Sequence, residues 1–163
     1  MNIFVLNSDP AKAAKMLCDS HVRKMCVETA QILSGVMLRR GMELYEDMPK
    51  PQNINHPVIV AVDFAAFDEA LDWVLNYNFA LHKEYTMRFG SYHAYSELTL
   101  EYINELWSGG DGSCEKLNKC CGDLDVADMD IVSAYRKYYT EVKKPALLEK
   151  NMWKFTKRED WTK

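Results

Sequence analysis

The chain has 163 residues, of which 48% are hydrophobic, 12% aromatic and 27% charged. This length is typical of one domain with a real core, and the aromatic content is too high for a disordered chain. A net charge of −4 and an isoelectric point near 5.6 exclude a strongly basic nucleic-acid-binding protein. The apolar runs fall far short of the roughly 20 residues that span a bilayer, and no signal peptide is recognisable. We therefore expect one soluble, cytoplasmic domain without membrane partners.

The opening of the chain predicts a short segment followed by a long helix. Residues 1–6 form a short β-like run. Asp9 can then cap a helix whose first position is Pro10. Apolar residues at helical spacing extend this helix to Arg39-Arg40, with a break expected near residues 18–20 and a stop at Gly41. One face of this helix should be buried.

Apolar periodicity predicts further helices in the rest of the chain. The predicted spans are Pro57 to Gly90, which is long enough for two helices, Tyr95 to Trp107, and Ile131 to Val142 after an Asp130 cap. Turn residues mark residues 45–56 and about 108–128 as loops, the second of them flexible. The sequence thus predicts a mainly α, single-domain helical bundle over residues 1–163.

The end of the chain differs in charge from the rest. Residues 131–163 hold nine Lys or Arg and four Asp or Glu, a net charge of +5, which leaves −9 for the first 130 residues. Residues from about 145 to 163 form a basic and aromatic tail. Any contact with a polyanion should therefore depend on this tail and on local basic positions. A solvated helix face with a loose basic end is the alternative interpretation.

The five cysteines indicate neither a disulfide framework nor a metal site, because their number is odd and their spacing irregular. Cys114, Cys120 and Cys121 lack the paired spacing of a structural zinc site, and no histidine lies close to them in the sequence. Reduced thiols in a loop are the simpler interpretation. We expect neither a metal nor a cofactor.

Five side chains follow one another at helical spacing along the first long helix and should share a face. They are Cys18, His21, Lys24, Glu28 and Gln31. His21 and Glu28 are seven residues apart, roughly 10.5 Å along a helix axis, so a ligand group fits between them. The imidazole and the carboxylate suit acid and base roles, and Lys24 suits a phosphate. A solvated helix face with one Lys–Glu pair is the alternative.

The motif Asp19-x-His21 followed by Glu28, after a short N-terminal segment and a Pro-started helix, resembles the helical pyrimidine-dimer DNA glycosylases. Longer blocks, which span nearly the whole chain, are similar to small phage-type proteins that carry the same glycosylase label. These blocks are MNIFVLNSDP, CDSHVRKMCVETAQILS, Asn55-His56-Pro57 and residues 134–139.

The resemblance implies an essential catalytic glutamate on an early helix, here Glu28, with His21 at the family's spacing. It also implies that an aromatic and basic C-terminal segment contacts DNA. The residues of this chain that fit such a segment are Trp153, Lys154, Lys157 and Arg158. The family's nucleophile is the α-amine of an N-terminal Thr exposed by removal of methionine. This chain begins Met1-Asn2, and the bulky second residue predicts a retained methionine.

Four residues elsewhere are candidates for binding substrate or phosphate: His56, Arg88, Tyr135 and Arg136. His56 precedes a helix start, where backbone N–H groups can hold an anion. The two arginines could balance a phosphate, and Tyr135 belongs to an aromatic and basic helix suited to stacking on bases. A turn residue, a helix ion pair and half-buried tyrosines would give the same pattern.

These patterns predict a phage-type enzyme, in the cytoplasm of a host cell, that acts on pyrimidine bases of DNA or on nucleotides. The reaction is either glycosylase-like or a base-hypermodifying transfer, in which an amine replaces a pyrophosphate on the base. Glu28 and His21 are the predicted acid and base, and Lys24 and Gln31 the predicted substrate contacts. One alternative is a non-catalytic protein that binds a nucleotide or blocks a host factor, and another is a structural or oligomer-forming protein.

Overall fold

The computed structural model describes residues 1–64, 68–143 and 153–155. These described residues form six α-helices and one π-helical turn: α1 (Pro10–Met16), α2 (Asp19–Arg39), α3 (Pro57–Asp63), α4 (Glu69–Phe89), α5 (Leu98–Leu106), α6 (Ile131–Tyr138) and η1 (Tyr139–Lys143). The described residues include no β-strand, which confirms the mainly α fold. None of the helices in these ranges combines the length and the apolar character that crossing a membrane requires.

The first helical region has the break and the ends that the sequence predicts. Asp9 caps α1, because its Oδ1 accepts hydrogen bonds from the backbone N of Ala11 at 2.9 Å and of Lys12 at 3.2 Å. Extended backbone at Leu17 and Cys18 separates α1 from α2. Gly41 ends α2 with a φ of +74°, a conformation that glycine adopts without strain.

The segment that starts at Pro57 is divided into α3 and α4, as its length suggested. Asp68 occupies the N-cap position of α4 with a φ of 54°, yet its side chain makes no capping hydrogen bond. Its Oδ1 instead accepts from Nη2 of Arg40 at 2.6 Å. This carboxylate therefore connects the end of α2 to the start of α4.

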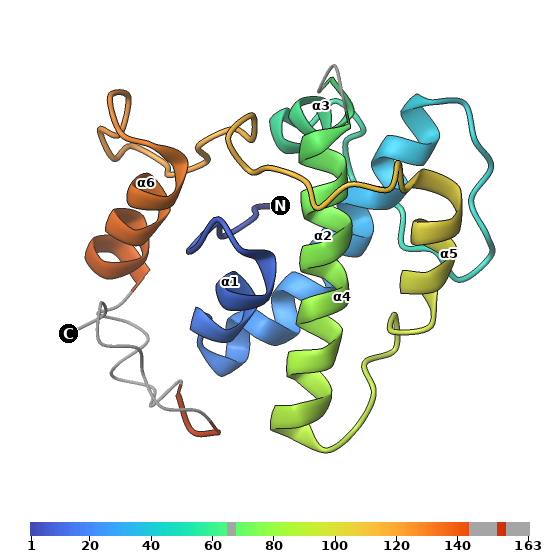
Figure 1. The fold of residues 1–163 in the computed structure, drawn as a ribbon, viewed down its shortest axis with the longest axis horizontal. Helices are drawn as coiled ribbons and strands as arrows, with labels where there is room; N and C mark the ends of the chain where they lie inside the picture. The colour runs from blue at the N-terminus through green and yellow to red at the C-terminus, as the bar shows by residue number, and fades with distance from the viewer. Residues whose placement is uncertain (65–67, 144–152, 156–163) are drawn as a thin grey trace.

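The long helices α2 and α4 pack against each other and form the centre of the fold (Figure 1). Helix α4 also contacts α1, α3 and α5. Fully buried aromatic side chains of α4 include Trp73 and Tyr77, whose rings stack with centroids 4.8 Å apart. Helix α6 lies on one side of this pair and α5 on the other (Figure 1).

The N-terminal segment, which we expected to be β-like, is buried but forms no strand within the described part of the chain. Side chains of other elements bind its backbone carbonyls in place of a strand partner. Arg136 Nε donates to Leu6 O at 2.8 Å, and Tyr77 Oη donates to Phe4 O at 3.2 Å. This arrangement brings the amino terminus to the α2–α4 pair, on the side of α6 (Figure 1).

The loop between α5 and α6 is attached to α4 near its start. The Asp72 carboxylate accepts hydrogen bonds from Ser108 N at 3.1 Å, Ser108 Oγ at 2.6 Å and Gly110 N at 3.0 Å. Gly112 has a φ of +77°, and a Cβ at this position would lie 2.1 Å from Trp73 N. Only glycine therefore permits this approach of the loop to α4.

Candidate active site

A pocket of about 220 Å³ opens beside Glu28. It is lined by Met1, Glu28, Gln31, Gln52, Asn53 and His56. Three of these residues, Glu28, Gln31 and His56, are candidates from the sequence. The pocket brings together α2, the amino terminus and the loop that precedes α3.

The Glu28 carboxylate is surrounded by nitrogen groups. Its Oε2 accepts a hydrogen bond from the backbone N of Asn2 at 3.0 Å. Its Oε1 lies 3.4 Å from Nζ of Lys24 and 3.9 Å from the amino group of Met1. Glu28 is 8% exposed, so these contacts hold a largely buried negative charge next to an amine.

The amino-terminal residues are held in place by the Asn2 side chain. Asn2 Nδ2 donates to Cys120 O at 2.9 Å, and Asn2 Oδ1 accepts from Tyr135 Oη at 3.0 Å. The Tyr135 hydroxyl also accepts from Cys120 N at 3.1 Å. Tyr135, a predicted substrate contact, is fully buried and here fixes the position of the chain end beside Glu28.

His56 both lines the pocket and caps α3. Its Nδ1 accepts from Val58 N at 3.3 Å, which in the neutral ring places the proton on Nε2. Burial lowers the pKa of His56, the amino terminus lowers it further, and Glu28 opposes this effect. The pocket therefore contains a neutral imidazole with one N–H donor at pH 7.

His21 has different surroundings from Glu28, although both were expected to share one cavity. It is not among the residues that line the pocket. Its ring stacks on Phe4 with centroids 4.7 Å apart, and its Nδ1 lies 2.9 Å from Tyr139 Oη. Burial, with smaller contributions from Lys24 and Lys143, lowers the pKa of His21 to about 4, so the ring is neutral at pH 7.

Arg88 is surrounded by partners from the protein itself. Its Nε donates to Glu84 Oε1 at 2.7 Å, and its Nη1 donates to Asp19 Oδ1 at 3.1 Å. Its Nη groups also donate to the carbonyls of Leu17 and Lys15. The side chain is 1% exposed, so the structure places this predicted phosphate contact inside the protein, where it joins α1, α2 and α4.

Arg136 and residues 153–155, the described part of the tail, are not among the residues that line the pocket beside Glu28. Arg136 lines a separate pocket with Asn7 and Ser8. Trp153 packs edge-on against Tyr139 with centroids 6.4 Å apart, and Lys154 is exposed. The backbone N of Phe155 donates to Asp19 Oδ2 at 3.0 Å. The other two predicted DNA contacts, Lys157 and Arg158, lie outside the described residues.

The sequence patterns did not identify four residues of this site: Met1, Asn2, Gln52 and Asn53. Asn53 had a usable signal, because its Oδ1 accepts from Asn55 N at 2.8 Å in a local turn of a type that asparagine favours. This turn leads into the His56 cap. The meeting of residues 1–2 with α2 depends on tertiary packing and has no local signal.

A family model described as pyrimidine dimer DNA glycosylase matches residues 1–96, which is more than half of the chain. The chain therefore belongs to the pyrimidine dimer DNA glycosylase family, and the resemblance seen in the sequence is confirmed. The match includes every residue that lines the pocket beside Glu28. Comparisons with curated proteins and with solved structures found no match.

Proposed function

We propose that this protein removes pyrimidine bases from DNA and that Glu28 is its catalytic carboxylate. The observation that supports this most is the placement of the Glu28 carboxylate and the Met1 amino group in one pocket, 3.9 Å apart. Membership of the pyrimidine dimer DNA glycosylase family supports the same class of reaction. His21 was expected to act with Glu28. Its proposed role is instead to position the N-terminal segment, through its ring contact with Phe4.

The chemistry requires a nucleophile and a group that moves protons. An amine attacks C1′ of the deoxyribose, and the base leaves with the electron pair of the glycosidic bond. The amine loses a first proton, the base gains a second, and the remaining N–H proton passes to O4′ as the sugar ring opens, which leaves an imine between the amine nitrogen and C1′. The Glu28 carboxylate can accept the first proton and supply the second.

The remaining pocket residues suit recognition of a base. Gln31, Gln52 and Asn53 offer amide donors and acceptors, and His56 offers a ring N–H. Enzymes that act on a base in duplex DNA turn it out of the stack and bind its polar edge in a pocket. Lys24 has a side chain that is 55% exposed beside Glu28, which supports a contact with a DNA phosphate.

Two other functions fit the same pocket, and the experiment below distinguishes them from base removal. The same pocket would serve a transferase that joins an amine to a modified pyrimidine, with Glu28 as the base. It would also serve a protein that only binds a nucleotide. The proposed glycosylase is distinguished from both by cleavage of the glycosidic bond of an unmodified or dimerised base without a second substrate.

The test is incubation with a duplex that contains one thymine dimer, beside the same duplex undamaged. We expect strand breakage at the dimer after alkali treatment, because loss of the glycosidic bond leaves an alkali-labile site, and an intact control duplex. Calorimetric titration with the dimer duplex and with nucleotides accompanies this assay. Tight binding without breakage would contradict the proposal in favour of a sequestering protein. Absence of both binding and breakage would also contradict it.

A further inference from the structure

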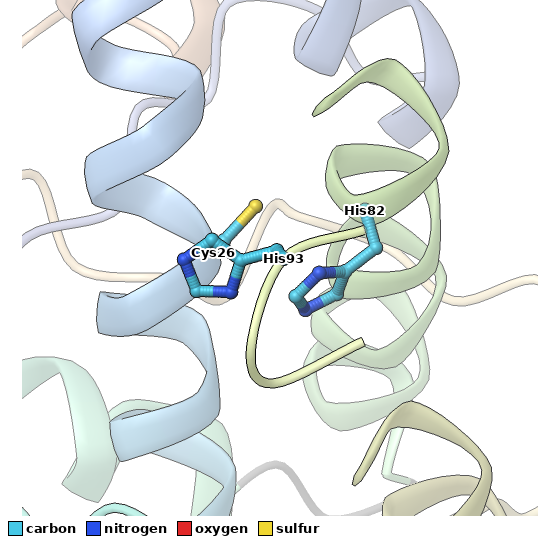
Figure 2. A group of neighbouring side chains, drawn as sticks. All are labelled: Cys26, His82 and His93. Carbon is cyan, nitrogen blue, oxygen red and sulfur yellow. The ribbon is translucent and has the colours of Figure 1, made fainter. Parts of the chain in front are cut away.

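Three potential metal ligands meet on the side of α2 that packs against α4. They are Cys26 of α2, His82 of α4 and His93 of the loop between α4 and α5. One ligand atom from each lies within 4.8 Å of the others. Figure 2 shows the three side chains beside one another, with Cys26 on α2, His82 on α4 and His93 on the loop that follows α4. Cys26 is 0% exposed, His82 is 5% exposed and His93 is half-buried.

The His82 ring has a buried polar atom without a partner. Its Nδ1 is buried, and no hydrogen bond to it occurs within the described ranges. Its Nε2 lies 3.5 Å from Nδ2 of Asn78, a side chain that Thr29 and Thr99 hold in place. Buried polar atoms are nearly always satisfied in folded proteins, so an orphaned imidazole nitrogen indicates that something binds there.

We propose that Cys26, His82 and His93 bind a zinc ion. A thiolate and two imidazoles are ligands that zinc favours, whereas magnesium and calcium require oxygen ligands. Zinc bonds of about 2.3 Å to sulfur and about 2.0 Å to nitrogen bring tetrahedral ligand atoms to within roughly 3.3–3.7 Å of each other. Zinc binding therefore requires the three ligand atoms, now within 4.8 Å of one another, to move closer by side-chain rotation, and His93, on a loop, has the most freedom to move.

The neighbours of the two histidines fit this site. His93 Nδ1 accepts from Tyr95 N at 3.1 Å, so zinc binding at that nitrogen replaces this hydrogen bond and shifts the loop. His82 also lines a groove of about 380 Å³ between α4 and α5. Water in this groove can supply the fourth ligand, which completes a tetrahedral site.

The zinc ion would join three segments that are distant in the sequence. It connects α2 and α4 to the loop before α5, a place where the described chain has no disulfide. A ligand that binds only the folded state stabilises it. This inference is independent of the proposed base removal, because none of the three ligands lines the pocket beside Glu28.

The experiment is titration of the reduced, chelator-treated protein with cobalt(II), a spectroscopic substitute for zinc. We expect one equivalent to bind with the visible absorption of a tetrahedral site and the charge-transfer band of a cobalt–thiolate bond. Addition of zinc should remove both signals and raise the melting temperature. If the protein binds no cobalt, or binds it without a thiolate band, the proposal is wrong.

Variants identify the ligands. Cys26→Ser should abolish the thiolate band, and His93→Ala should weaken cobalt binding by more than the roughly 10- to 100-fold that loss of an outer-shell partner costs. Cys120→Ser removes a cysteine outside the group and should leave the titration unchanged. His93 is half-buried on a loop, so its variant is expected to fold, which circular dichroism verifies. Unchanged binding in both ligand variants would contradict the proposed site.

Discussion

Replacement of Glu28 by Gln is expected to slow glycosidic-bond cleavage by about 10²- to 10⁴-fold, the usual contribution of a positioned acid–base group. The amide has nearly the same size and can still accept from the backbone N of Asn2, now 3.0 Å from Oε2. It cannot take a proton from the Met1 amine, and it no longer offsets the charge of Lys24. The measurement is the single-turnover rate of glycosidic-bond cleavage in the dimer duplex, followed as alkali-labile strand breakage.

The matched control for Glu28→Gln is Glu101→Gln. Glu101 is an exposed carboxylate on α5, and it lies outside the Glu28 pocket. This variant removes the same charge from the protein and should retain the full rate. An unchanged rate in Glu28→Gln, or an equal loss in both variants, would show that the Glu28 carboxylate is not the catalytic group.

Replacement of Arg88 by Met is expected to lower the free energy of unfolding by about 3–5 kcal/mol, because it leaves buried charges unpaired. Asp19 and Glu84 are 7% and 6% exposed, and both lose the guanidinium that contacts them. The carbonyls of Lys15 and Leu17 also lose their donor. Met retains the packing of the aliphatic part of the side chain, so the loss of unfolding free energy reflects the unpaired charges and not lost packing. Urea denaturation at pH 7 measures it.

Arg40→Met provides the comparison for Arg88→Met. Arg40 contacts Asp63 and Asp68, but its side chain is 31% exposed. Partly exposed ion pairs contribute about 1 kcal/mol or less, so this variant should be much closer to wild type. A stable Arg88→Met protein with weakened DNA binding would instead support the phosphate role that the sequence suggested for Arg88.

Much of the fold was predictable because local signals and burial agree. Asp9, Pro10 and Gly41 are strong signals for helix ends, and all three act as expected. The apolar positions of α2, such as Val22 and Leu33, are fully buried. The N-terminal segment was predicted less well. An apolar run of six residues has no periodicity that distinguishes a strand from an irregular buried segment.

The site was predicted in part, for a geometric reason. Helical spacing correctly places His21 and Glu28 on one face of α2, yet the two residues are separated by roughly 10.5 Å along the axis. Over that distance the helix passes different neighbours. His21 meets Phe4 and Tyr139, whereas Glu28 meets the amino terminus. Spacing along one helix gives no information about the segments that cross it.

Residues brought together by tertiary packing were the least predictable. Arg88 has a pair partner at i−4 visible in the sequence, but Asp19, its second acidic partner, is 69 residues away. Cys26, His82 and His93 belong to three separate segments, so no spacing motif indicates a shared site. The cysteines near residue 120 drew attention by their proximity in sequence, although the potential metal ligands gather around Cys26.

Reductive trapping tests the central claim most directly. Sodium borohydride, added during the reaction with the dimer duplex, reduces an imine between C1′ and an amino group to a stable secondary amine. We predict a covalent protein–DNA adduct that forms with the wild-type protein and is lost in Glu28→Gln. The bond to DNA should map to the Met1 amino group, 3.9 Å from Glu28. Glycosidic-bond cleavage without any adduct, or an adduct on a side chain such as Lys24, would contradict the proposed mechanism.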